Sequence, residues 1–315
     1  MANETTTTTL TELVYGEWIS PFIQSYAANY QNPSQFLAKW NPLNGSATVS
    51  VPKWVSDQGD VTDTGTAVDT EFDATEGTDL ANSDLETTES GFSIAEYGLM
   101  REVTDTVLES AQSAESLLSF IIPDGASILM AAANDDVCAL FASFTGQSGA
   151  TTVNLSVADI DDALYDLAER GALGELVGVL DHQQIRDFSD ALQATGTSMA
   201  VYAGSADRQM GTSFDKNQGR NVEGYCFDYK GVPFYRNGLC DTATAGADVV
   251  GGIFVRGDIE SQRATAALGQ ASLREFRVET ERNASKRSTE VVMTMRWGCG
   301  ITHNTMGQEI LSDAP

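Results

Sequence analysis

Residues 56–92 form a long stretch that cannot fold by itself. The stretch is rich in Asp, Glu and Thr, contains neither Lys nor Arg, and is interrupted by four glycines. Its few apolar side chains cannot bury enough surface to offset the conformational entropy that ordering costs. A segment of this length between regular elements is either disordered or functional. Alternating pieces such as residues 67–72, together with the β-branched strand pattern of residues 47–55, favour a long two-stranded excursion from the body of the protein.

The N-terminal 45 residues also lack the means to make their own core. Seven aromatic side chains are scattered through polar sequence, and Pro21, Pro33 and Pro42 interrupt any long helix. We expect these aromatics to pack on another part of the chain or on a neighbouring copy. No basic residue precedes an apolar run, and no run approaches about 18 apolar residues, so neither a signal peptide nor a transmembrane helix is expected. These features predict a soluble protein that folds in a cytoplasm.

The charge balance is strongly acidic and uneven along the chain. The 18 Lys and Arg residues face 45 Asp and Glu residues, a formal net charge of −27 at pH 7. Residues 1–170 contain 27 of the acids and 4 of the bases. Such a chain is poorly suited to bind nucleic acid by phosphate neutralisation, which needs clustered bases. Two explanations stay open: adaptation to salt or solubility, or an acidic half that meets a more basic surface on a neighbouring copy.

Cysteine and histidine residues are few and dispersed. None of the four cysteines forms a C-x-x-C pair, and the chain has two histidines. A zinc site is therefore not expected, and no disulfide framework is visible. We expect buried free thiols. The cysteines are Cys138, Cys226, Cys240 and Cys299.

No catalytic constellation stands out. The chain contains no G-x-x-x-x-G-K-[ST] phosphate loop, no G-x-S-x-G elbow and no H-E-x-x-H motif. Adjacent acids at Asp135-Asp136 and Asp161-Asp162 would point about 100° apart on a helix, so neither pair converges on a metal ion. His182 has no neighbouring nucleophile. We therefore expect no catalytic, cofactor-binding or metal-binding residues, and no enzyme.

Apolar spacing predicts four helices. One follows Thr104 and carries apolar residues from 107 to 121, and a second covers 128–141 after a break or kink at Pro123-Asp124-Gly125. A capping-box pattern at Ser156 and Asp159 opens the third, which Gly171 ends. Asp181 and Gln184 open the fourth in the same way. Residues 176–180 between the last two read as a short strand, which makes an α/β unit.

Strand signals dominate the C-terminal third. Residues 224–235 predict a hairpin turning at Lys230-Gly231, and residues 251–255 predict a further strand. Two alternating strands, 273–280 and 289–297, are joined by a charged turn. The polar stretch 203–222 reads as a mobile loop.

Several short motifs then occur in a particular order. They are Val49-Ser50-Val51-Pro52 in the first strand, Glu76-Gly77 in the excursion, Ala95-Glu96-Tyr97-Gly98 and Val103-Thr104-Asp105 after it, Asn134-Asp135-Asp136 in the second helix, the hairpin 224–235, and the closing strands 274–297. In this order they resemble the major capsid protein of tailed double-stranded DNA bacteriophages, along nearly the whole chain. Pro123 departs from the pattern, because it falls where the family has its long spine helix.

The resemblance implies an α+β fold, the tailed-phage major capsid fold. It would have an N-terminal arm, an extended hairpin called the E-loop, a peripheral domain with the spine helix and long β-strands, and an α/β axial domain. The implied boundaries are 1–45 for the arm, 46–98 for the E-loop with its flanking strands, 99–147 and 270–298 for the peripheral domain, and 148–269 and 299–315 for the axial domain.

The resemblance also implies three contact sites between copies. Charged residues of the turn between the closing strands would meet their counterparts where three capsomers join. Mixed charges of the loop 203–222 would surround the centre of each capsomer, and acids of the E-loop would lie on a neighbour. The first set is Glu281, Arg282, Lys286, Arg287 and Glu290. The second is Asp207, Arg208, Asp215, Lys216 and Arg220. The third is Asp73, Glu76 and Asp79.

The function so implied is self-assembly, through hexamers and pentamers, into an icosahedral head that encloses phage double-stranded DNA without sequence-specific binding and without a membrane. The implied partners are a portal protein and a separate scaffolding protein, with a decoration or cement protein as a further candidate. The implied location is the virion capsid, assembled in the host cytoplasm. An encapsulin-like nanocompartment shell is the alternative with the same fold, and particle contents distinguish the two. An acidic cell-surface or carbohydrate-binding protein and an enzyme are the alternatives from other classes.

Overall fold

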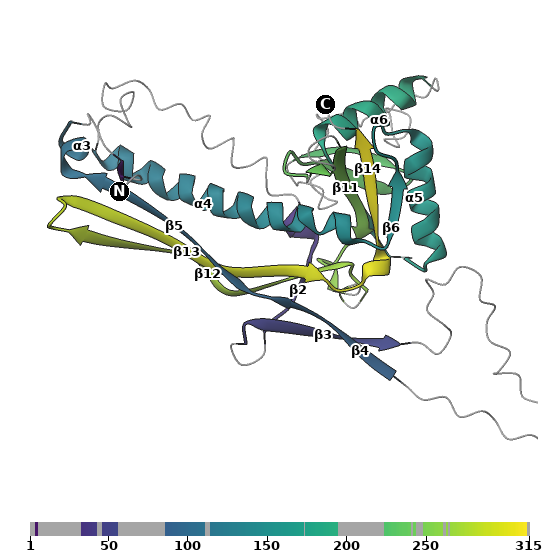
Figure 1. The fold of residues 1–315 in the computed structure, drawn as a ribbon, viewed down its shortest axis with the longest axis horizontal. Coiled ribbons are helices and arrows are strands. Elements are labelled where there is room, and N and C mark those ends of the chain that lie inside the picture. Colours follow the sequence, from purple (N-terminus) through teal and green to yellow (C-terminus); the bar gives the residue numbers. More distant parts are fainter. Residues whose placement is uncertain are drawn as a thin grey trace, which may run out of the picture.

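The structure is a computed structural model that describes most of the chain and leaves several segments out. The described residues are 4–5, 33–42, 46–55, 86–110, 114–172, 174–194, 224–240, 242–243, 248–260, 263 and 265–313. Most of the acidic excursion, residues 56–85, and the whole loop 203–222 lie outside them. Figure 1 shows an elongated molecule, with an α/β part at one end and a long sheet and helix reaching to the other.

A five-stranded sheet runs along the molecule in the order β1-β5-β13-β12-β2. Its strands are β1 (Glu4–Thr5), β2 (Ala38–Lys39), β5 (Ala95–Thr104), β12 (Leu268–Asn283) and β13 (Ser288–Ile301). The two predicted closing strands are confirmed and are longer than expected. Val291, Met293 and Met295 alternate inward along β13, as the sequence pattern predicts. On β12 the pairing register shifts between Arg274 and Arg277, so that strand is less regular.

One long helix, α4 (Ala114–Ala139), lies on this sheet after a short helix, α3 (Asp105–Ser110), that begins directly after Thr104. The predicted break at Pro123 is wrong, because α4 continues through it. A proline removes one backbone donor from a helix, but here contacts with β5 hold the part of the helix that follows it. Arg101 lies 2.9 Å from Asp124, and the Tyr97 hydroxyl donates to Asp136.

Gly125 allows α4 to approach the sheet closely. A Cβ atom at this position would lie 2.2 Å from Sδ of Met293 and 3.4 Å from Cδ2 of Leu99. By length and composition alone, the stretch Ile121–Ser143 is apolar enough to cross a membrane. Core helices of soluble proteins can meet the same criterion. In this fold its buried side chains, among them Leu129 and Val137, belong to the main hydrophobic cluster.

The α/β part is a second sheet with strand order β6-β14-β11-β7-β9-β8, in which β10 also pairs with β11. Helices α5 (Val157–Glu169) and α6 (His182–Ala194) pack on it (Figure 1). The strands are β6 (Gly146–Gly149), β7 (Leu176–Leu180), β8 (Tyr225–Tyr229), β9 (Val232–Arg236), β10 (Thr242–Ala243), β11 (Asp248–Val255) and β14 (Gly307–Asp313). A short 3₁₀ turn at Phe141–Ser143 leads from α4 into β6, and another at Asn304–Met306 leads from β13 of the long sheet into β14. Strand β7 has the predicted bounds.

Local signals in this part are confirmed. The Ser156 hydroxyl accepts from the backbone N–H of Asp159, whose carboxylate accepts from the backbone of Ser156 in return. Gly171 ends α5 with a φ of +79°. The β8–β9 hairpin turns at Lys230 and Gly231, both with positive φ, as a two-residue hairpin turn requires.

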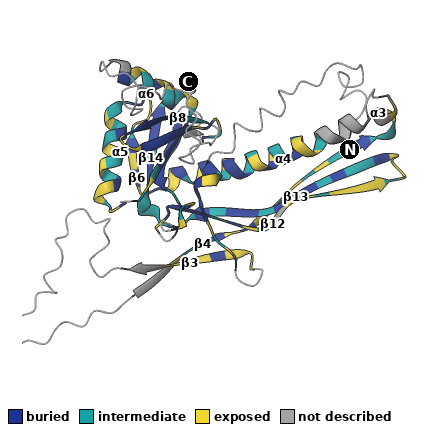
Figure 2. Cartoon of the chain, turned by 180° about the vertical axis from the view of Figure 1, so that it is seen from behind, coloured by how far each residue is buried: buried dark blue, intermediate teal, exposed yellow. Residues whose placement is uncertain are grey.

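Residues 33–40 join the two sheets. Phe36 and Leu37 are buried, and the Phe36 carbonyl accepts from the backbone N–H of Gly257. The Phe36 ring packs on Tyr235 with centroids 4.7 Å apart. Two of the seven N-terminal aromatics, Phe36 and Trp40, therefore pack on the same chain, and the other five lie outside the described residues. Figure 2 shows burial concentrated near this junction and in the α/β sheet.

The base of the predicted two-stranded excursion is present. Strand β3 (Thr48–Val55) pairs antiparallel with β4 (Glu86–Ser93) in a sheet of its own. Val49, Val51 and Phe92 form a small core with Ile94 and Ala271. In Figure 1 this pair lies below the long sheet, on the side opposite α4 and the α/β part.

Candidate assembly surface

The first predicted contact site lies at the far end of the β12–β13 hairpin, where residues 284–287 form the turn. This end is the point of the long sheet most distant from the α/β part (Figure 1). All five predicted residues are described, and the structure brings them together with four others from the hairpin, β5 and α3. The added residues are Glu102, Asp105, Asn283 and Ser288.

Three glutamates stand opposite one another across adjacent strands. Glu102 on β5 pairs in register with Glu290 on β13, which pairs in register with Glu281 on β12. Directly opposed residues share one face of a sheet, and like charges so placed repel. The tip therefore needs cations or donors on this face.

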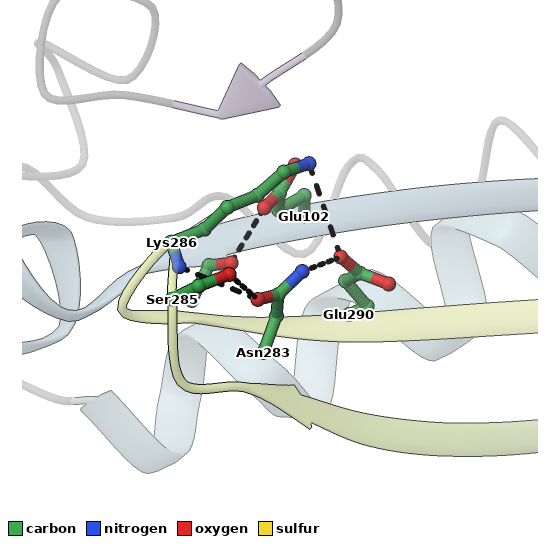
Figure 3. A network of polar contacts seen from close by, with 6 residues as sticks. Glu102, Asn283, Ser285, Lys286 and Glu290 are labelled. Carbon is green, nitrogen blue, oxygen red and sulfur yellow. Dashed lines mark hydrogen bonds and ion pairs between the residues drawn. The ribbon is translucent and has the colours of Figure 1, made fainter.

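Lys286 and two neutral side chains supply most of that compensation (Figure 3). The Lys286 ammonium lies 3.2 Å from Glu102 and 4.0 Å from Glu290, and the Asn283 amide donates to Glu290 at 3.0 Å. The Ser288 hydroxyl donates to Glu102. That hydrogen bond, together with the nearby ammonium, lowers the pKa of Glu102 against the effect of its burial.

A second pair ties the tip to the start of α3. The Arg282 guanidinium donates to both carboxylate oxygens of Asp105, with Nη2 2.7 Å from Oδ2. This contact lowers the pKa of Asp105 and raises that of Arg282. The backbone N–H of Asp105 donates to the carbonyl of Arg287 at 2.8 Å, and Arg287 has a φ of +54°. The same corner therefore fixes the backbone of the turn.

Two of the five predicted residues remain without an ion pair inside the described part of the subunit. They are Glu281 and Arg287, both exposed. Arg282, Lys286 and Glu290 are engaged within the subunit, so the predicted set divides into charges that hold the tip together and charges that face outward.

Sequence reasoning missed Glu102 and Asp105 as members of this site. Glu102 is 3% exposed, yet it sits in an alternating strand where its outward position predicts solvent. Its contact with the hairpin tip could have been recognised only from the register that places β5 beside β13. Asp105 belongs to the predicted helix start, and an acidic residue in that first turn is the signal that the sequence offers.

The other two predicted sites lie outside the described residues. This holds for Asp207, Arg208, Asp215, Lys216 and Arg220 of the capsomer-centre loop. It holds equally for Asp73, Glu76 and Asp79 of the E-loop.

Other candidate side chains have structural partners. Asp161 accepts from the Tyr229 hydroxyl at 2.9 Å and lies 2.7 Å from the Lys230 ammonium. Within the described residues, no group of three or more His, Cys, Asp or Glu side chains is placed to hold a metal ion. The four cysteines are free thiols, and burial raises the pKa of Cys299 to about 12.

No protein-family model and no curated protein matches the sequence. Solved structures do match over nearly the whole chain. A structure of Mycobacterium phage Bobi has a TM-score of 0.59 at 13% identity and covers 98% of this chain and 99% of its own. The capsid structure of the cyanophage P-SCSP1u has a TM-score of 0.58 at 13% identity, covering 95% and 92%. The capsid of a native GTA particle has a TM-score of 0.56 at 13% identity, covering 91% of each chain. The chain therefore has the α+β fold of tailed-phage capsid subunits, as the sequence resemblance predicted.

Proposed function

We propose that this chain is a major capsid protein that assembles through hexamers and pentamers into the icosahedral head of a tailed phage. The observation that carries the proposal is the fold likeness to head and capsid structures from end to end, including the capsid of cyanophage P-SCSP1u and the head of Helicobacter pylori bacteriophage KHP40. The proposed role is structural, without catalysis.

The shape of the subunit supports this role. The β12–β13 hairpin and the β3–β4 pair both project from the body, and each leaves strand surface that the described residues do not cover (Figure 2). Met100 and Phe276 of the long sheet are exposed large apolar side chains. Closed shells of identical chains need extended contacts of this kind, because each copy must touch several others.

The E-loop would lie on a neighbouring copy. Its acids, among them Asp73, Glu76 and Asp79, would need cations there. Exposed Arg274 and Arg277 on β12 would be shared for this purpose with their partners inside the subunit, Glu96 at 3.3 Å and Glu279 at 2.6 Å. The base-free composition of residues 56–92 and the arginines of the long sheet are thus complementary in sign.

The loop 203–222 would surround the centre of each capsomer. Strands and helices of the α/β part flank it, since α6 ends at Ala194 and β8 begins at Tyr225. Its acids and bases could pair between like copies around an axis. Those residues are Asp207, Arg208, Asp215, Lys216 and Arg220.

The five-stranded sheet with α4 would form the peripheral domain and the α/β part the axial domain, with the charged tip at the junction of three capsomers. The remaining proposed components are a portal protein, a scaffolding protein, a candidate decoration or cement protein, and enclosed double-stranded DNA. The shell would assemble in the host cytoplasm and become the virion capsid.

Negative-stain electron microscopy of the purified protein at high concentration tests the proposal. Icosahedral shells or rings of capsomers are the expected result, and a protein that stays monomeric under all conditions contradicts it. Particles recovered from the native source separate the two shell functions. Double-stranded DNA inside supports a phage head, whereas a packaged enzyme supports an encapsulin-like compartment.

A further inference from the structure

We propose that Glu281 of one copy and Arg287 of a second copy form the ion pair that joins hairpin tips. The proposal rests on the proposed shell function, because it needs copies whose tips meet around a shared axis. It goes beyond that function by assigning the contact to two residues and by excluding the other tip charges.

The exclusion follows from contacts within the subunit. Arg282 is engaged by both oxygens of Asp105, and Lys286 is shared between Glu102 and Glu290. Recruiting either cation to a neighbour would leave buried or opposed carboxylates uncompensated. Leaving a buried carboxylate without its cation costs more free energy than a new exposed ion pair supplies, since exposed pairs are worth about 0–1 kcal/mol.

Glu281 is the one of the three opposed glutamates, Glu102, Glu290 and Glu281, that no described cation contacts. Lys286 contacts the other two members, Glu102 and Glu290, and no described cation lies within ion-pair distance of Glu281. Strand β2 pairs with β12 only at Gly269 and Gln270, at the opposite end of the strand. Among the described residues, β12 is therefore an open edge at the tip, and Glu281 stands on it.

Arg287 is an exposed cation of the tip and forms no ion pair with a described residue, although its charge adds to that of Arg282 in lowering the pKa of Asp105. Its backbone is held in the left-handed region, at a φ of +54°, a conformation that non-glycine residues rarely adopt. The hydrogen bond from Asp105 to its carbonyl supports that conformation. The side chain of Arg287 thus starts from a fixed backbone, which reduces the entropy that an intermolecular contact costs.

Glu281 and Arg287 have no ion-pair partner among the described residues, and both lie at the same projecting end. One such acid and one such base allow copies related by a rotation to pair with one another. Each copy can give Arg287 to one neighbour and accept the arginine of the other neighbour at Glu281. The pattern closes on itself around an axis, and no tip charge is left unused. A guanidinium also suits a carboxylate better than an ammonium does, because it can donate two parallel hydrogen bonds.

A charge-swap series tests the pair. Single variants Glu281→Arg and Arg287→Glu place like charges together and should raise the subunit concentration needed for assembly at low salt by about fivefold or more. The double variant carrying both changes restores opposite charges and should assemble like the wild type. Assembly is measured by light scattering and confirmed by electron microscopy. Circular dichroism and thermal unfolding check that each variant folds.

Matched controls separate the pair from net charge. Glu169→Arg on α5 and Arg186→Glu on α6 change exposed residues of the α/β part by the same charge. They should leave assembly unchanged. If the single tip variants assemble like the wild type, if the double variant fails to recover, or if the controls are equally impaired, the pair is wrong while the shell function stands. A wild-type protein that never assembles overturns the shell function, and the pair with it.

Discussion

The ammonium of Lys286 lies 3.2 Å from the carboxylate of Glu102, a residue 184 positions earlier in the chain. The contact fastens the turn of the β12–β13 hairpin to the neighbouring strand β5. Glu102 is nearly fully buried, whereas the lysine side chain is about half exposed. The lysine therefore covers the acid from the solvent side, and its first role is to stabilise the tip of the subunit.

Removing the Lys286 charge should loosen the tip. Lys286→Met keeps the length of the side chain but leaves Glu102 and Glu290 facing each other without a cation. We expect the melting temperature to fall by about 2–4 °C, with faster hydrogen exchange in residues 280–290. Lys230→Met at the other hairpin turn is the control, because Asp161 keeps its hydrogen bond from Tyr229. Equal effects of the two changes would show that the lysine over Glu102 has no special role.

Acid should weaken this corner of the fold. The pKa values of Glu102 and Asp105 are lowered in the folded state, so both carboxylates stabilise the protein fully above their unfolded values of about 4. That stabilisation is lost as the pH falls through the folded pKa values. Glu102→Gln should therefore reduce the free energy of unfolding at pH 7 and flatten its decline below pH 5, roughly where carboxylates titrate.

Ionisation of Glu309 should lower the stability of the fold, the opposite of the effect of Glu102 and Asp105. Burial raises its pKa, so its ionisation opposes folding at neutral pH and this cost disappears as the acid is protonated. Glu309→Gln should raise the free energy of unfolding at pH 7 and change little at about pH 3. Urea unfolding at several pH values measures both variants. A loss of stability in Glu309→Gln at neutral pH would contradict the burial argument.

Gln184 should be the more sensitive of two neighbouring glutamines in α6. It is fully buried, and its amide donates to the carbonyls of Val249 at 3.1 Å and Ile310 at 3.0 Å. Gln184→Leu leaves these groups without that donor and should cost about 2–3 kcal/mol of unfolding free energy. Gln183→Leu should cost less, about 1 kcal/mol, because Gln183 donates to one side chain of the same helix, the buried Asp187, and no backbone carbonyl loses a donor. Similar losses for both would mean that the contact between α6 and the sheet is weak.

Gly125 tests the seating of α4 on the long sheet. Gly125→Leu would drive a side chain into Met293 and should destabilise the protein by about 1–3 kcal/mol, although leucine favours helix more than glycine does. Ala139→Leu, at an exposed position of the same helix, is the control. Thermal unfolding compares them, and a stable Gly125→Leu variant would show that the helix can move away from the strand.

Local features were predictable from the sequence and long-range ones were not. The caps of α5 and α6 and the turn at Lys230-Gly231 depend on residues a few positions apart, so their patterns sufficed. Pro123 misled because α4 packs on the long sheet and buries Leu129, Ala133 and Val137 in the main hydrophobic cluster, which no local pattern shows. The partners of the tip charges were missed for the same reason. Which acid faces Lys286 depends on the register of β5 against β13, and no local pattern encodes that register.

The order of weak motifs predicted the fold better than any single motif. Neither Glu76-Gly77 nor Tyr97-Gly98 is distinctive, yet the order of the motifs along the chain predicted the fold that the solved structures share with it. The predicted contact sites were harder to predict from the sequence. A contact between copies depends on which charged side chains already form ion pairs within the subunit. Arg282 and Glu281 are adjacent in sequence, and only the structure separates the paired one from the free one.

Electron cryomicroscopy of particles assembled from the wild-type protein tests the central claim most directly. The account predicts closed icosahedral shells in which hairpin tips from neighbouring capsomers meet, with Arg287 of one copy against Glu281 of the next. Protein that remains monomeric at every concentration and salt condition would contradict the proposed capsid function.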